Sequence, residues 1–136
     1  MIGLKKGRYS AREATSPEDV RAAQALRARC FGLDRATATF DAHCAHILIT
    51  RTSDGALVCC FRMMPLCGAD ISRSYSAQYY ELSALEAYGG KMVEMGRFCV
   101  DPEVSAPDIL RVAWGAMTAY VEANGVEMLF GCSSLA

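Results

Sequence analysis

Hydrophobic positions along this chain follow two periods, and each change of period marks the end of a predicted element. Apolar side chains recur at helical spacing in two segments and form short, strand-like runs in five others. We predict two helices, from Ser16 to Phe31 and from Ser105 or Asp108 to Glu122 or Ala123, and strands over 8–15, 46–51, 56–65, 91–100 and 126–132. This order predicts an α/β (α+β) fold with a mixed sheet.

Local signals set the ends of several elements. The run Ser16-Pro17-Glu18-Asp19 supplies a capping hydroxyl, a proline for the first turn and acids for the positive end of a helix dipole. Asp54-Gly55 predicts a tight hairpin between two antiparallel strands. The last helix should stop at Asn124-Gly125, and the strands before and after it should lie parallel.

Composition and charge exclude some classes of protein. The 136 residues, 52% hydrophobic and 21% charged, can bury one core, so we expect a single domain over 1–136. A net charge of -1 gives no basic field for nucleic acid. The longest apolar stretch, 56–67, contains Arg62 and is too short to span a bilayer, so we expect a cytoplasmic protein, at most peripheral to the inner face of the membrane.

A basic cluster lies within the first twelve residues and has two interpretations. It is a solvated, fraying terminus, or it faces an anionic membrane or an acidic carrier protein. Its members are Lys5, Lys6, Arg8 and Arg12. The first interpretation is favoured.

The seven cysteines do not indicate a disulfide scaffold, because their number is odd and several lie in apolar runs. Those in apolar runs, Cys59, Cys60 and Cys99, are interpreted as buried thiols. The spacing within 43–46, which holds two histidines and a cysteine, is tighter than that of structural zinc sites. We therefore predict no metal site.

Charged residues inside apolar elements are candidate site residues. Arg27 lies on the core side of the first helix, four residues before Phe31, and Arg62 lies in an apolar strand. A buried guanidinium needs a carboxylate or several carbonyls, and Asp41 is the candidate partner for both arginines. Either this network is structural and holds 32–45 to the sheet, or it binds a substrate carboxylate.

The strand over 91–100 carries a second charged pair, Glu94 and Arg97. Strict alternation would place them on opposite faces, but a bulge at Gly96 would bring them to the same side. The pair is either a salt bridge or part of a reactive site. Covalent catalysis by Cys99 or Cys132 is a minor alternative, because a free buried cysteine is usually structural.

These residues resemble the ornithine acyl-carrier-protein N-acyltransferases of the GNAT superfamily and, more distantly, the acyl-homoserine lactone synthases. The resemblance covers most of the chain from Arg21 onward. It rests on Arg27 and Phe31, Phe40-Asp41, Cys60-Phe61-Arg62-Met63-Met64-Pro65, Glu94-Met95-Gly96-Arg97-Phe98-Cys99-Val100 and Phe130-Gly131-Cys132-Ser133-Ser134. It implies a GNAT-like mixed central sheet flanked by helices, with a bulged strand that admits the pantetheine arm of a thioester donor.

The resemblance also implies a bacterial enzyme of lipid biosynthesis. A fatty, 3-hydroxy acyl chain would pass from the phosphopantetheine of acyl carrier protein to the α-amine of ornithine or a similar amine, giving lyso-ornithine lipid without a bound cofactor. The residues that would bind the acceptor or order its site are Arg27, Phe31, Asp41 and Arg62. Those implied for catalysis are Glu94, as general base or water relay, and Arg97, and those implied for the donor are Phe98, Cys99 and Val100.

Three departures from the family pattern qualify these expectations. The tryptophan of the lactone synthases has no counterpart in 32–39, and the pyrophosphate loop of coenzyme A-dependent enzymes is absent from 101–111, which favours a carrier-protein donor. A complete GNAT domain continues past the strand over 126–132, so we expect a domain truncated at its C-terminal end, with an open sheet edge through which copies can associate. The alternatives are an acyl-homoserine lactone synthase and a catalytically incomplete domain that binds the carrier protein.

Overall fold

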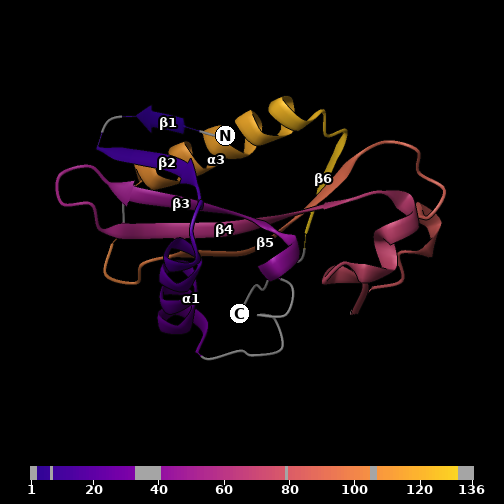
Figure 1. The fold of residues 1–136 in the computed structure, drawn as a ribbon, viewed down its shortest axis with the longest axis horizontal. Helices are drawn as coiled ribbons and strands as arrows, with labels where there is room; N and C mark the ends of the chain where they lie inside the picture. Colours follow the sequence, from indigo (N-terminus) through magenta and orange to yellow (C-terminus); the bar gives the residue numbers. More distant parts are fainter. Residues whose placement is uncertain (1–2, 7, 33–40, 79, 105–106, 132–136) are drawn as a thin grey trace.

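The computed structural model describes residues 3–6, 8–32, 41–78, 80–104 and 107–131 (Figure 1). Within these residues, six strands form one sheet in chain order. Neighbouring strands are antiparallel up to the fifth, and the last pair is parallel. The strands are β1 (Gly3–Lys6), β2 (Tyr9–Glu13), β3 (Ala45–Arg51), β4 (Leu57–Leu66), β5 (Met92–Val100) and β6 (Met128–Phe130).

Two long helices flank the sheet, α1 (Pro17–Phe31) and α3 (Pro107–Asn124), and lie on opposite sides of it in Figure 1. The Ser16 hydroxyl accepts a hydrogen bond from the Asp19 amide at 3.2 Å, so α1 begins as predicted. Gly125, with φ of 63°, follows the end of α3. The predicted mixed sheet flanked by helices is confirmed. Among the described residues, no helix has the length and apolarity needed to cross a membrane.

Alternating side chains of the central strands form a core on each face of the sheet. Ile47, Ile49 and Phe61 belong to the core under α3, whereas Leu48 and Cys60 pack against the buried face of α1. Both faces of β3 and β4 are therefore covered, which explains why the sequence of β4 is apolar at nearly every position. Because both faces are covered, a polar side chain of β4 must find its hydrogen-bond partners within the protein, and this applies to the charged side chain of Arg62.

The segment between β4 and β5 is built from short 3₁₀ turns, η2 (Gly68–Arg73), η3 (Ser76–Gln78) and η4 (Ser83–Leu85). The sequence indicated only a polar connection here. Ile71 is buried in a small cluster with Met64, Leu66 and Met92. That cluster anchors the segment over one end of the sheet.

Two predictions at the ends of the chain need correction. The basic terminus interpreted as fraying forms β1, whose Gly3 and Lys6 pair with Arg12 and Tyr9 of β2. Backbone pairing to an edge strand needs no apolar pattern, so this strand could not be predicted from hydrophobic periodicity. The strand predicted over 126–132 is shorter, and residues 132–136 lie outside the described part. β6 ends the strand order, as expected, and association through its edge stays a prediction.

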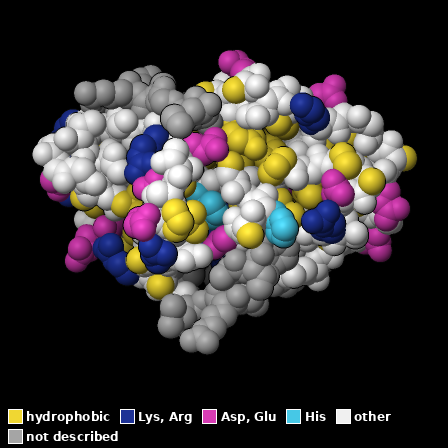
Figure 2. All heavy atoms as spheres, viewed as in Figure 1, with side chains coloured by type: hydrophobic (Ala, Val, Ile, Leu, Met, Phe, Trp, Pro, Cys, Tyr) yellow, Lys and Arg dark blue, Asp and Glu magenta, His cyan; other side chains and the backbone are white. Residues whose placement is uncertain are grey.

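Charged side chains of both signs are interspersed on the face drawn in Figure 2. This mixture of charges on the drawn face agrees with the net charge of -1.

Gly68 gives a test of how tightly the segment after β4 is packed. A Cβ there would meet the carbonyl oxygens of Tyr88 at 2.7 Å and Leu85 at 2.8 Å, and that of Glu86 as well. Because backbone atoms cannot move aside cheaply, we expect Gly68→Ala to lower the free energy of unfolding by about 2 kcal/mol.

The matched control is Gly89→Ala in the same segment, where a Cβ would meet nothing within 4 Å. We expect it to change stability by less than about 0.5 kcal/mol. Chemical denaturation measures both variants, and equal losses would show that Gly68 is not confined as described.

Candidate active site

A buried carboxylate, that of Asp41, joins α1 to the central strands. Asp41 begins the short turn η1 (Asp41–His43) and is 7% exposed. Arg27 of α1 donates to it from Nη1 to Oδ1 at 2.9 Å and from Nη2 to Oδ2 at 2.5 Å. Arg62 of β4 donates to Oδ1 at 2.9 Å, and Gln24 of α1 donates to Oδ2 at 2.8 Å. The predicted pairing of both arginines with Asp41 is confirmed.

The charge of Asp41 depends on these donors. Burial alone would raise its pKa, but hydrogen bonds from Arg27 and Gln24 outweigh burial and lower the pKa from 3.8 to about 2. Burial would likewise lower the pKa of Arg27, and Asp41 outweighs that effect, so the pKa of Arg27 is raised. Asp41 and Arg27 are therefore both ionised at neutral pH.

The strand β5 has the bulge predicted from its glycine, although the bulged residues differ from that expectation. Arg62 pairs with Gly96 and Cys60 with Cys99, so Arg97 and Phe98 together stand opposite Phe61. Arg97 has φ of 52°, which costs an L-residue about 1–2 kcal/mol. The extra residue is thus Arg97, not Gly96, and the left-handed conformation turns its side chain toward the face that carries Glu94.

Glu94 is held by the backbone of the segment that follows η2. Its side chain is buried, with 4% exposure, on the face of the sheet shared with Arg62, since its register partner is Met64. Oε1 accepts the Tyr75 amide at 2.8 Å and Oε2 accepts the Ser76 amide at 2.7 Å. The two bonds fix the orientation of the carboxylate, and each oxygen has a second lone pair.

The ring of Tyr75 lies against two guanidinium groups. The Cζ atom of Arg62 is 5.8 Å from the ring centroid and that of Arg97 is 5.6 Å from it. Tyr75 is the residue that sequence reasoning missed, because neither the amide that binds Glu94 nor the long-range ring contacts leave a local pattern. The structure thus brings Glu94, Arg62 and Arg97 together around it.

The side chains of the residues predicted to bind the donor lie in the two cores of the sheet. Phe98 stacks on Phe61, with ring centroids 5.8 Å apart, and so belongs to the core under α3. Val100 packs on the same core, and Cys99 belongs to the core under α1. The side chain of Phe31, with Phe40 and residues 132–134, lies outside the described part.

Cys44, Cys59 and Cys99 are protonated thiols at neutral pH. A hydrogen bond with Cys60, whose Sγ lies 3.4 Å away, and burial raise the pKa of Cys99. Burial also raises the pKa of Cys59 and, to about 11, that of Cys44. A nucleophilic cysteine needs the opposite shift, so these thiols are unsuited to covalent catalysis. Cys132 lies outside the described residues.

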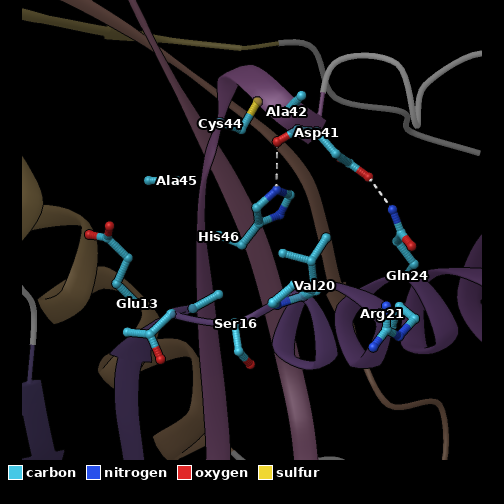
Figure 3. A pocket seen from close by; sticks show the side chains of 13 residues that line it. Glu13, Ser16, Val20, Arg21, Gln24, Asp41, Ala42, Cys44, Ala45 and His46 are labelled. Carbon is cyan, nitrogen blue, oxygen red and sulfur yellow. Dashed lines mark hydrogen bonds between the residues drawn. The ribbon is translucent and has the colours of Figure 1, made fainter.

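An open pocket of about 710 Å³ borders the Asp41 network (Figure 3). It lies between the end of β2, the first turns of α1, η1 and β3. Gln24 and Asp41 face each other on its wall, and His46 Nε2 lies 2.9 Å from the carbonyl oxygen of Asp41. Within the described residues, no three His, Cys, Asp or Glu side chains are grouped to hold a metal. The wall of this pocket is thus fixed by the same carboxylate that joins α1 to β4.

Comparison with known families decides the class of protein. The model described as "Acetyltransferase (GNAT) domain" matches residues 20–115. The chain belongs to this GNAT family. The matched residues include most of α1, the Asp41 network, the bulged strand β5 and the start of α3.

Relatives of this GNAT domain are named for acyl transfer. L-ornithine N(alpha)-acyltransferases from Rhodobacter capsulatus and Brucella abortus are 38% identical over 66 residues and 28% identical over 149 residues. The first alignment covers 48% of this chain and 26% of the relative, and the second covers 94% and 53%. An acyl-homoserine-lactone synthase from Agrobacterium fabrum is 34% identical over 54% of this chain and 35% of that relative. The chain spans about half, or less, of the length of these relatives.

A solved structure supports the fold of this GNAT domain. FeeM, an N-acyl amino acid synthase from uncultured soil microbes, matches with a TM-score of 0.66 at 19% identity, covering 90% of this chain and 69% of that one. This likeness confirms the GNAT-like fold that the sequence predicts.

The lowered pKa of Asp41 predicts an acid-sensitive contribution to stability. Because its pKa is lower in the folded protein than the ordinary 3.8, this contribution is complete above about pH 4 and is lost as pH falls through about 2. The stability difference between wild type and Asp41→Asn should therefore narrow by about 1 kcal/mol between about pH 6 and pH 3, as measured by denaturation.

The matched control for this titration is Asp54→Asn, at an exposed carboxylate paired with Arg51 at 2.8 Å. The hydrogen bond from Arg51 lowers the pKa of Asp54 to about 2 as well, but solvent screens this exposed pair, so its stability difference should change less with pH than that of Asp41→Asn. Parallel pH profiles for wild type and Asp41→Asn would contradict the proposed ionisation.

Proposed function

We propose that this GNAT domain serves an N-acyltransferase that moves a fatty, 3-hydroxy acyl chain from acyl carrier protein to the α-amine of ornithine. The observation that carries the proposal is the similarity to L-ornithine N(alpha)-acyltransferases, one of which aligns with 94% of the chain at 28% identity. The product would be lyso-ornithine lipid. An enzyme that makes a lipid would work at the inner face of the cytoplasmic membrane without spanning it.

The chemistry is direct attack of a neutral amine on a thioester. The N–C bond forms as the C–S bond breaks, and the proton that the amine loses passes to a base and from there to the leaving pantetheine thiolate, which departs as the thiol. The donor is the acyl-phosphopantetheine of the carrier protein, so no resident cofactor is needed. Glu94 is the proposed base, directly or through a water molecule.

The contacts of Glu94 support this role. Amides from Tyr75 and Ser76 hold one lone pair of each oxygen, so the carboxylate keeps one orientation while a second lone pair can accept from an ammonium group or water. A buried base on a rigid strand is pre-organised for proton transfer.

The remaining proposed roles divide between the two substrates. β5 stays paired with β4 on both sides of the bulge, whereas among the described residues it pairs with β6 only over residues 92–94. Beyond that pairing, the backbone of Phe98, Cys99 and Val100 would bind the pantetheine arm and the carbonyl oxygen of the thioester. Arg97 would complete the reactive site. The residues proposed to order the acceptor side are Arg27, Phe31, Asp41 and Arg62.

An acyl-homoserine lactone synthase is the second candidate, because a relative of that name is 34% identical over 74 residues. Mass spectrometry of the product formed from 3-hydroxyacyl carrier protein separates the two: an N-acyl amino acid from ornithine supports the proposal, and a lactone favours the second candidate. Carrier-protein binding without any product would favour a domain that only binds the carrier.

The variant Glu94→Gln tests the base. We expect the rate of ornithine acylation to fall by about 10² at neutral pH, since general-base catalysis contributes roughly 10² to 10⁴. The deficit should shrink as pH rises toward about 10, where the amine is already neutral. Steady-state rates between neutral and alkaline pH measure it.

Glutamine at this position can accept only one of the two amides, so a structural loss must be separated from loss of the base. A purely structural effect would give the same deficit at every pH, and that result would remove Glu94 from the proton transfer. The control is Glu103→Gln, at an exposed carboxylate beyond β5, which should leave the rate unchanged.

A further inference from the structure

Tyr75 is fixed independently of Arg97. Its amide donates to Oε1 of Glu94 at 2.8 Å, and the next amide, of Ser76, donates to Oε2 at 2.7 Å. The backbone at Tyr75 is therefore bound to a buried carboxylate of β5. A residue held through its backbone can place its ring in only a few rotamer positions.

Arg62 supports the same ring from β4. Its guanidinium lies 5.8 Å from the Tyr75 ring centroid, and its Nη1 donates to Asp41 at 2.9 Å. Arg62 is 3% exposed, so its guanidinium has little freedom to move away from the ring. Aromatic ring and cation attract each other through the negative face of the ring.

Arg97 contacts the ring from the bulge. Its guanidinium lies 5.6 Å from the Tyr75 centroid, its backbone is left-handed with φ of 52°, and its side chain is half-buried. A long side chain on a bulge has many rotamers, and contact with a fixed ring selects few of them. The ring thus helps to determine where the guanidinium points.

We propose that Tyr75 is a positioning residue that holds the Arg97 guanidinium beside Glu94 for an oxyanion of a substrate. The inference rests on the proposed acyl transfer and adds to it a residue from the segment between β4 and β5. Guanidinium groups recognise carboxylate and phosphate alike. The oxyanion is therefore the carboxylate of the acceptor amino acid or the phosphate of the pantetheine arm.

Kinetics of Tyr75→Leu and Tyr75→Phe test the proposal. Removing the ring with leucine should raise the KM for one substrate by about fivefold and leave kcat within about twofold, the loss expected for one cation–π contact. Phenylalanine keeps the ring and should restore the wild-type KM. A raised KM for ornithine assigns the carboxylate, and a raised KM for the acyl carrier protein assigns the phosphate.

The matched control is Tyr80→Leu, at a tyrosine of the same segment whose side chain is 59% exposed. Its kinetic constants should equal those of wild type. An unchanged KM for both substrates in Tyr75→Leu would overturn the proposal, and so would a Tyr75→Phe variant as impaired as Tyr75→Leu.

A spectroscopic measurement separates failure of this inference from failure of the proposed function. In NMR spectra, the ring should shift the Nε–H and side-chain proton resonances of Arg97 upfield. These resonances are assigned by their loss in Arg97→Lys. Tyr75→Phe keeps a ring and should keep the upfield shift. If wild type transfers no acyl group yet shows the shift, the positioning stands and the proposed function fails. Arg97 resonances at ordinary positions in wild type would overturn the positioning, whether or not Tyr75→Leu folds.

Discussion

The rest of the structure depends on one buried ion, the Asp41 carboxylate. Taking a carboxylate and two guanidinium groups out of water is costly unless every charge is paired. Here α1 supplies Arg27 and Gln24, and β4 supplies Arg62, so the cost is offset only when helix and sheet are correctly docked. An interaction of this kind selects one arrangement of the two elements, which apolar packing of α1 alone would specify less sharply.

The same ion links the two halves of the candidate site. Asp41 holds Arg62, Arg62 contacts the Tyr75 ring, and the ring contacts Arg97 at the bulge. Glu94 is the last member of this chain of contacts, because its carboxylate accepts the backbone amide of Tyr75. Charged groups from α1, β4 and β5 are therefore connected through a segment that has little regular structure of its own. The chemistry proposed for Glu94 requires this connection, since a base acts only if its orientation is kept.

The sequence predicted the parts of this arrangement that depend on local pattern. Ser16-Pro17-Glu18-Asp19 indicated the start of α1, and an arginine in an apolar strand required a carboxylate, for which Asp41 was a good candidate. Gly96 correctly indicated a bulge. These signals are short-range or follow from the cost of burying charge.

Contacts that depend on three-dimensional register could not be predicted in the same way. Nothing local indicates that Arg97, a residue that pays to adopt φ of 52°, takes the bulge in place of Gly96. The amides of Tyr75 and Ser76 reach Glu94 across 19 and 18 residues of sequence. Such backbone donors are present at every position, so only the fold reveals which of them bind.

The most direct test of this account is the stability of Arg62→Ala against that of Arg51→Ala, since both arginines pair with an aspartate but only Arg62 is buried. Loss of Arg62 leaves part of a buried carboxylate uncompensated and should lower the free energy of unfolding by about 3 kcal/mol, whereas loss of Arg51 should cost a small fraction of that. Denaturation of both variants measures the difference. Equal and small losses would contradict the central role given to the Asp41 ion.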